Sequence, residues 1–297
     1  TLDRFLDEAG FGRAIRDQYL YPMAAAIWSC PRGEIGAFPA LTFLRFFNNH
    51  GLVQLSGRPK WETVEGGSSR YMDRLIGDLG ERAQAGTAVV AVARREPHVE
   101  VRLADGRVEH FDDVVLACHT DQARRVLKHA HPGERAILDA VCYQANRVIL
   151  HRDASLMPRE RRVWSSWNYL SGATRDEVSA VSVTYWMNSL QRLATSHDYF
   201  VSLNPLIEPD AAEVVAEFSY DHPMFNLDAL NAQRQLQRIQ GRDRIWFAGA
   251  WTGYGFHEDG ARSGVEVARA LGAHVPWEQQ VEASRDLASI TQTREAA

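Results

Sequence analysis

The chain has 297 residues, of which 45% are hydrophobic and 24% are charged, a composition typical of a folded globular protein and not of a disordered one. Asp and Glu (38) outnumber Lys and Arg (33), and the formal net charge of −5 argues against a nucleic-acid partner. No apolar run approaches the ~20 residues of a membrane-spanning helix, and a peripheral contact with a membrane stays open.

The three cysteines, Cys30, Cys118 and Cys142, are widely spaced and form no CxxC pattern. They predict packing roles, no metal site and a reducing compartment, so that a cytoplasmic location is expected. No G-x-S-x-G, H-E-x-x-H or P-loop motif is present, and hydrolysis and phosphoryl transfer therefore have no support.

The N-terminal segment up to Leu55 predicts amphipathic helices. Apolar residues recur at helical spacing from Leu2 to Tyr19, and a phenylalanine-rich stretch lies between Phe38 and Phe47. We expect these helices to cap a ligand cavity.

The next block begins at Lys60 and predicts a helix followed by a strand. Gly66 and Gly67 precede a helix that begins near Ser68 and carries apolar residues on one face. A strand from Thr87 to Arg94 follows. This part of the chain therefore predicts a mixed α/β arrangement.

A hairpin and a buried strand come next. Asp105 and Gly106 mark the turn of the hairpin, because this dipeptide favours the positive φ angles of tight turns. The run from Asp113 to Cys118 is nearly continuously apolar, which is typical of a strand covered on both faces. It ends at His119, before a helix expected to start near Asp121.

Residues 141–220 alternate short β-rich runs with turns, which predicts a mostly antiparallel sheet. The expected strands are residues 147–151, 163–169, 180–187, 199–203 and 214–220. The runs are rich in aromatic residues, including Tyr185 and Trp186, and part of this set is expected to line a substrate cavity. His119, His222 and Asn168 are weaker candidates, each expected to anchor a turn.

Near the C-terminus, the apolar strand Ile245–Ala248 leads into glycine-rich turns and then into a helix opened by Gly260 and Ala261. Unpaired N–H groups and the helix dipole favour anionic or electron-rich ligand atoms at such a helix start. His257 is the candidate acid or base in front of this helix, with a capping role as the alternative.

These blocks resemble the flavin-binding signatures of FAD-dependent amine oxidases and phytoene-desaturase-like proteins. The segments that show this resemblance are Phe247-Ala248-Gly249, residues 259–264 (DGARSG), the Gly66-Gly67 helix, the strand Val89–Val92 and the strand Asp113–Ala117. The family often has an acidic residue after FAG that binds the ribityl chain. This chain has Ala250, so that contact is expected from the backbone or from another residue.

The resemblance implies FAD as the cofactor and a set of site residues. The implied cofactor contacts are Gly66, Gly67, Val89, Ala117, Gly249, Ala250, Gly255, Glu258, Asp259, Gly260 and Ala261. The candidate catalytic residues are His257, Tyr185 and Trp186, and no metal ligand is proposed.

The expected fold class is mixed α/β, with an incomplete Rossmann-like FAD domain interleaved with a mostly antiparallel substrate domain. The FAD domain is assigned to residues 60–128 and 238–273, the substrate domain to residues 1–59 and 129–237, and residues 274–297 to a tail. No G-x-G-x-x-G stands between a strand and a helix, so we expect a fragment without its first βαβ unit that binds FAD poorly.

A narrower resemblance is to bacterial predicted NAD/FAD-binding oxidoreductases associated with cyclopropane-fatty-acid synthase-type methyltransferases. It implies a dehydrogenase or desaturase acting on a fatty-acyl or lipid-like small molecule, with a lipid methyltransferase as an expected partner. Three alternatives stay open: a flavin-binding accessory subunit without turnover, a flavin amine oxidase, and a lipid carrier without flavin.

Overall fold

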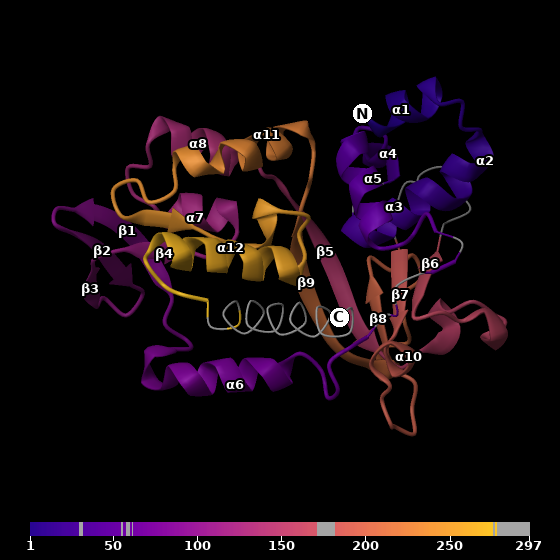
Figure 1. Cartoon of the computed structure of the whole chain (residues 1–297). Helices are drawn as coiled ribbons and strands as arrows, with labels where there is room; N and C mark the ends of the chain where they lie inside the picture. The colour runs from indigo at the N-terminus through magenta and orange to yellow at the C-terminus, as the bar shows by residue number, and fades with distance from the viewer. Residues whose placement is uncertain are drawn as a thin grey trace, which may run out of the picture. The chain divides into compact units, whose positions relative to one another are not determined.

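A computed structural model describes residues 1–29, 32–54, 56–57, 60, 62–170, 182–275 and 277 (Figure 1). The chain forms two compact units, each built from two segments. The first unit comprises Thr1–Ala88 and Ala140–Ala232, and the second comprises Val89–Asp139 and Gln233–Ala297. Cys30 lies outside the described residues, as do residues 276 and 278–297 of the expected tail.

The first unit begins with short helices around an aromatic core. The helices are α1 (Leu2–Glu8), α2 (Arg13–Ile15), the π-helical η1 (Arg16–Leu20), α3 (Tyr21–Trp28), α4 (Arg32–Ile35) and α5 (Ala40–Asn49). Trp28 of α3 lies 4.7 Å from Phe38 and 4.8 Å from Phe46, between ring centroids. The expected helices are present but interrupted, because Gly10 adopts a positive φ of 70° after α1.

A five-stranded antiparallel sheet, with strand order β6-β7-β8-β5-β9, forms the rest of this core. The strands are β5 (Tyr143–His151), β6 (Trp167–Leu170), β7 (Ser182–Trp186), β8 (Phe200–Leu203) and β9 (Val214–Pro223). Its connections contain η3 (Ala154–Leu156), η4 (Arg161–Val163), α10 (Met187–Gln191) and η5 (Ala211–Glu213). The expected antiparallel sheet is confirmed, although the strand expected from Val163 begins only at Trp167 because η4 occupies the preceding residues.

A buried polar row crosses this sheet. Nε2 of His151 is hydrogen-bonded to Oγ of Ser202 at 2.8 Å, and the Ser202 hydroxyl also lies 2.7 Å from Oγ1 of Thr184. All three residues have no exposed surface. Burial lowers the pKa of His151, and the nearby Asp153 acts in the opposite direction through its charge and a backbone hydrogen bond.

We expect stability to fall as the pH drops below about 6.5, the ordinary histidine value, because the unfolded chain then takes up a proton that folded His151 resists. Melting temperatures measured between pH 8 and pH 5 should show this loss in the wild type and a smaller slope in His151→Phe. The exposed His197 is the control, and His197→Gln should keep the wild-type slope. Equal slopes in all three proteins would contradict a role for His151.

Helix α6 (Ser69–Leu79) and the short η2 (Gly80–Arg82) connect the N-terminal helices to the second unit. The predicted helix is confirmed, with Ser68 as its N-cap, but no residue of α6 is buried. Its apolar face is exposed, with Leu75 at 54% and Ile76 at 48%. This exposed stripe differs from the covered face that amphipathic spacing normally indicates.

The second unit combines an antiparallel meander with a parallel strand pair (Figure 1). The meander consists of β1 (Val89–Arg95), β2 (His98–Leu103) and β3 (Val108–Phe111), and the parallel pair of β4 (Val114–Leu116) and β10 (Ile245–Phe247). The helices are α7 (Thr120–Val126), α8 (Pro132–Asp139), α11 (Leu227–Gln235), which crosses the unit boundary, η6 (Leu236–Arg238), η7 (Ala250–Thr252) and α12 (His257–Ala270). The expected hairpin and the shared sheet of β4 and β10 are confirmed.

The two edges of the parallel pair differ. On the outer side of β10, the Gln240 carboxamide donates from Nε2 to the Phe247 carbonyl at 2.7 Å and accepts from the Phe247 N–H at 2.8 Å. On β4, Val115 is 40% exposed, so this strand is not covered on both faces as its apolar run predicts. The side chain of Gln240 therefore caps the free edge of β10, whereas one face of β4 is exposed at Val115.

The boundaries of the two units differ from the expected domains. Residues 129–139 join the second unit because α8 is tied to it by two polar contacts. Glu134 of α8 pairs with Arg94 of β1, and Nε2 of His131 lies 2.8 Å from a carboxylate oxygen of Asp243. Residues 60–88 cluster with the first unit. None of the helices in the described ranges is long and apolar enough to cross a membrane.

Candidate functional site

The glycine-rich turn between β10 and α12 is held by side chains from two helices. Ser263 of α12 accepts the N–H of Gly249 at 2.9 Å, and Gln233 of α11 donates to the carbonyl oxygens of Trp251 and Gly253, each at 2.8 Å. Gly249 has a φ of 144°, which a residue with a side chain rarely adopts. The turn is thus a preorganised structure whose shape requires glycine.

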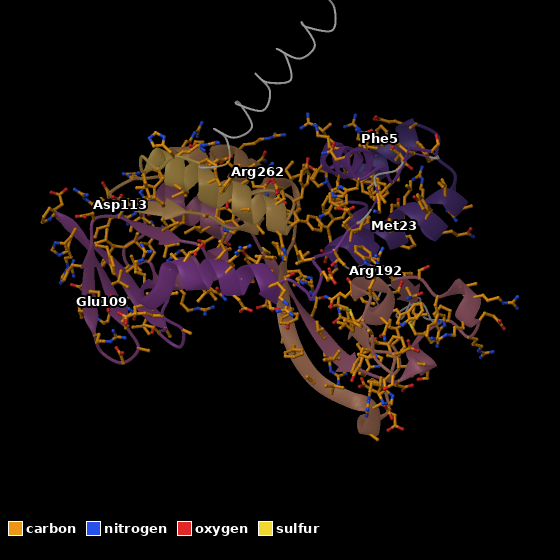
Figure 2. The ribbon with its side chains drawn as sticks, turned by 60° about the horizontal axis from the view of Figure 1, so that its bottom comes forward. Phe5, Met23, Glu109, Asp113, Arg192 and Arg262 are labelled. Atoms are coloured by element: carbon orange, nitrogen blue, oxygen red, sulfur yellow. The ribbon has the colours of Figure 1, made fainter. Side chains whose placement is uncertain are left out.

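Helix α12 begins at His257, three residues earlier than the expected start at Gly260. The reason is Asp259, whose carboxylate accepts the N–H of Phe256 at 3.1 Å and pairs with Arg262, a residue labelled in Figure 2. Asp259 is 4% exposed, so its carboxylate is engaged inside the protein. His257 and Glu258 are the exposed ionisable residues at this helix start.

Gly260 lies against the turn, where the helix and η7 approach closely. A Cβ at this position would be 3.7 Å from the backbone nitrogen of Ala250 and 4.0 Å from its Cβ. Ala261 follows on the exposed side of α12, and Gly255 has a φ of 94° just before the helix. The predicted cofactor contacts from Gly249 to Ala261 therefore belong to one continuous turn and helix start.

Two further predicted contacts, Val89 and Ala117, line one cavity of about 620 Å³ in the second unit. The cavity lies between β1, β4 and α7, and it is lined mainly by valines. Cys118 also lines it, and burial raises the pKa of this thiol. An apolar slot at the carboxyl end of a parallel strand is a common position for a nucleotide cofactor.

Gly66 and Gly67 line a separate cavity of about 940 Å³ in the first unit. The segment from Lys60 to Gly67 forms one wall, and Ser189 to Ala194, which follow the start of α10, form another. Arg192, labelled in Figure 2, is among the lining residues. Both glycines have a positive φ, 79° and 84°.

The candidates Tyr185 and Trp186 are neighbours on β7, and side chains alternate between the two faces of a strand. Trp186 donates from Nε1 to Asp198 at 2.8 Å and meets Trp164 edge-on at 5.3 Å. Tyr185 meets Trp167 at 5.6 Å, and burial raises its pKa. The two residues therefore face different surroundings within the sheet.

Of the weaker candidates, His119 lies at a helix start, whereas Asn168 and His222 lie within strands and not at turns. Asn168 accepts the N–H of Ser165 at 3.0 Å and donates to the carbonyl of Thr184 at 3.2 Å. His119 is the N-cap residue of α7, and His222 lies in β9 opposite Gln144. Asn168 is therefore an anchor of the sheet.

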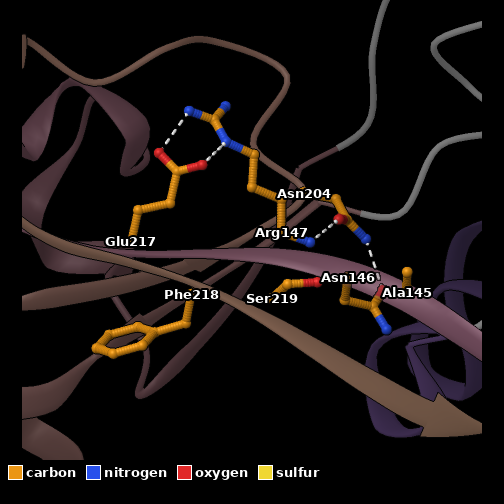
Figure 3. Close-up of a pocket in the computed structure, with 7 residues that line it drawn as sticks. All are labelled: Ala145, Asn146, Arg147, Asn204, Glu217, Phe218 and Ser219. Carbon is orange, nitrogen blue, oxygen red and sulfur yellow. Dashed lines mark hydrogen bonds and ion pairs between the residues drawn. The ribbon is translucent and has the colours of Figure 1, made fainter.

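A polar pocket of about 620 Å³ at one end of the antiparallel sheet was not expected from the sequence (Figure 3). The buried Asn146 accepts from Nδ2 of Asn204 at 2.7 Å, while Oδ1 of Asn204 accepts the N–H of Arg147 at 2.9 Å. Arg147 also pairs with Glu217 and Glu208. The pairs join residues 57 to 70 positions apart, and no local sequence pattern signals such contacts.

The second unit thus has a parallel strand pair that opens into a glycine-rich turn and a helix N-terminus, beside an antiparallel meander. This arrangement is typical of α/β units that bind a cofactor at a helix N-terminus. The chain belongs to the flavin containing amine oxidoreductases, a family that matches residues 2–188. Membership of this family supports FAD as the cofactor. The match ends before Gly249, so the turn geometry is a separate observation.

Several solved structures have a similar fold. The CLA-producing fatty acid isomerase from P. acnes is 15% identical with a TM-score of 0.65, and the match covers 92% of this chain and 66% of that protein. A triple mutant of putrescine oxidase is 16% identical with a TM-score of 0.64, covering 91% and 67%. Cyclohexylamine oxidase from Brevibacterium oxydans IH-35A is 14% identical with a TM-score of 0.63, covering 91% and 66%.

This chain spans about two thirds of the length of each of these structures. At this level of identity the likeness shows a shared fold. A search of curated proteins by sequence found no match.

The turn fits a flavin cofactor in two respects. Nε1 of Trp251 is buried and has no acceptor in the described part of the chain, so this N–H beside Gly249 could donate a hydrogen bond to a ligand. The absence of a side chain at Gly260 lets the start of α12, with its N–H groups, lie close to the turn. Both features suit a large, acceptor-rich ligand.

Proposed function

We propose that the protein catalyses an FAD-dependent dehydrogenation or desaturation of an apolar, acyl-type substrate. The FAD part of this proposal rests on the turn from Gly249 to Gly260, with its helix N-terminus and a buried indole N–H that has no acceptor among the described residues. Family membership supports the same chemistry.

Residues of the turn would hold the cofactor. The N–H groups at the start of α12 would stabilise negative charge on it. Val89 and Ala117 would supply apolar contacts from their cavity. When bound, FAD supplies a ring that accepts a hydride, while the protein orients the substrate and excludes water.

The proposed substrate class rests on two observations. The sheet of the first unit is rich in aromatic side chains, and one neighbour with the same fold is named as a fatty acid isomerase. An apolar chain suits such surroundings. We further propose a cytoplasmic location, and a lipid methyltransferase as partner.

His257 is proposed as the acid or base that acts on the substrate. His257→Ala should leave FAD bound but slow its reduction on the order of 10²-fold, because a positioned proton-transfer group contributes about that much. The measurement is anaerobic bleaching of the oxidised flavin absorbance by oleate in the full-length protein. Glu266→Gln, at an exposed position further along α12 and outside the predicted cofactor contacts, is the control and should keep the wild-type rate. An unchanged rate in His257→Ala would show that His257 has only a structural role.

The same assay separates the rival functions. Bleaching by putrescine and by no lipid would favour amine oxidation. A bound flavin that neither substrate reduces would favour an accessory subunit. A full-length protein without flavin absorbance would favour a lipid carrier and would contradict the proposal.

We also propose that the rest of the fold, present in the neighbours and not spanned here, supplies the pyrophosphate site. The exposed Val89, Val90 and Val115 of the second unit, at 39% to 45%, fit a surface that a further segment covers. We expect this chain alone to retain little FAD and to show low solubility. Stoichiometric FAD after purification of residues 1–297 would contradict this expectation.

A further inference from the structure

Trp251 is fixed in the turn by contacts on both its backbone and its ring. It is the middle residue of η7, and only 3% of its surface is exposed. Its carbonyl oxygen accepts from Gln233, and a Cβ at Gly249 would lie 2.8 Å from Cδ1 and 3.0 Å from Nε1 of the indole. The indole therefore lies directly against Gly249.

The indole nitrogen of Trp251 donates to no acceptor among the residues that the structure describes. A tryptophan nitrogen is a donor only, and burying a donor without an acceptor costs free energy. Trp246 in the neighbouring strand shows the ordinary case, because its Nε1 donates to Oδ1 of Asp113 at 2.8 Å. A group that brings an acceptor to Gly249 would remove the cost at Trp251.

The surroundings indicate the chemistry of that acceptor. Ser263 of α12 bonds the N–H of Gly249, so the start of this helix and the indole belong to the same turn. Both the helix N-terminus and the indole N–H favour oxygen atoms with negative or partial negative charge. Ala250, the residue between Gly249 and Trp251, has no polar side chain.

We propose that Nε1–H of Trp251 donates a hydrogen bond to an oxygen of the ribityl-phosphate chain of FAD. The inference rests on the proposed function, since it requires a flavin at this turn. It assigns to the Trp251 side chain a polar contact with the cofactor chain that the apolar side chain of Ala250 cannot make.

Trp251→Phe and Trp246→Phe, in the full-length protein, separate this role from a structural one. Trp251→Phe should weaken FAD binding about ten- to hundred-fold, as expected for a hydrogen bond with a charged group. It should lower the urea midpoint of the apoprotein less than Trp246→Phe does, because it removes a donor with no acceptor among the described residues, whereas Trp246→Phe breaks a hydrogen bond. Trp246→Phe should lower that midpoint and leave FAD affinity unchanged.

A second measurement needs no variant. In the wild type, the ¹⁵N-indole signal of Trp251 should move downfield and its hydrogen exchange should slow on addition of FAD, while the signal of Trp246 stays in place. Comparing riboflavin with FMN locates the acceptor. If Trp251→Phe lowers the affinity for both ligands, the acceptor is a ribityl oxygen. If it lowers the affinity for FMN alone, the acceptor is a phosphate oxygen.

Equal FAD affinity in Trp251→Phe, or an apoprotein destabilised as much as in Trp246→Phe, would overturn the inference while the proposed function stands. A wild-type protein that shows no flavin spectrum would instead overturn the proposed function, and the inference with it.

Discussion

Gly260→Val is expected to weaken FAD binding by about ten- to hundred-fold while the protein keeps its fold, because forcing extra carbon atoms into a closely packed space typically costs about 1–3 kcal/mol. The first added carbon finds ordinary contact distances, 3.7 Å from the nitrogen of Ala250. The branched γ carbons would extend beyond it into the space proposed for the cofactor. FAD occupancy and apoprotein melting, measured on the full-length variant, give the two readouts.

Gly264→Val is the matched control. Gly264 lies one helical turn further along α12, and a Cβ there would meet no atom within 4 Å. Both substitutions exchange the same residue types in the same helix, so their effect on helix propensity is equal. The control should bind FAD as the wild type does. Full occupancy in Gly260→Val would remove the proposed close approach of the cofactor at this helix.

Glu134→Ala is expected to destabilise the second unit by about 3–5 kcal/mol, the usual cost of removing one partner from a buried ion pair. Glu134 has no exposed surface, and its partner Arg94 has a side chain only 17% exposed. The carboxylate also accepts the N–H of His131 at 2.8 Å, at the start of α8. The substitution would leave a largely buried guanidinium with only the exposed Asp243, 3.6 Å away, as its counter-charge. Urea unfolding measures the loss as a lower midpoint at an unchanged slope.

Asp243→Asn tests whether burial is the cause. Asp243 also approaches Arg94, at 3.6 Å, but its side chain is 53% exposed. An exposed ion pair contributes about 0–1 kcal/mol, so this control should have a small effect. Similar losses in Glu134→Ala and Asp243→Asn would show that burial of the pair does not decide its contribution.

The sequence was sufficient for elements that neighbouring residues decide. The turn at Asp105 and Gly106 was predicted and is confirmed, since the Asp105 carboxylate accepts the N–H of Arg107 at 3.0 Å and Gly106 has a φ of 91°. These contacts span two residues and need no partner from elsewhere in the chain. The strands of the antiparallel sheet and the apolar strands β4 and β10 also follow from patterning over a few residues, whereas the parallel pairing of β4 with β10 joins segments far apart in the chain.

The predictions from the sequence were wrong where the outcome depends on the direction in which a side chain points. The start of α12 was expected at Gly260, but Asp259 faces inward and caps the helix from His257. The apolar stripe of α6 was correctly placed on one face, yet it is exposed. Periodicity indicates which residues share a face and does not identify what covers it.

Composition and local pattern by themselves determined the mixed α/β class and the glycine-rich turn, because these depend on backbone freedom and on the spacing of apolar residues. The expectation of FAD came from the resemblance of the sequence motifs to those of a known family. Tertiary structure alone decided that Gln240 closes the edge of β10, that Glu134 pairs with Arg94, and that the indole nitrogen of Trp251 is left without an acceptor. Each of these depends on which polar groups meet, or fail to meet, away from water. That outcome is set by packing between segments distant in the chain and leaves no periodic trace in the sequence.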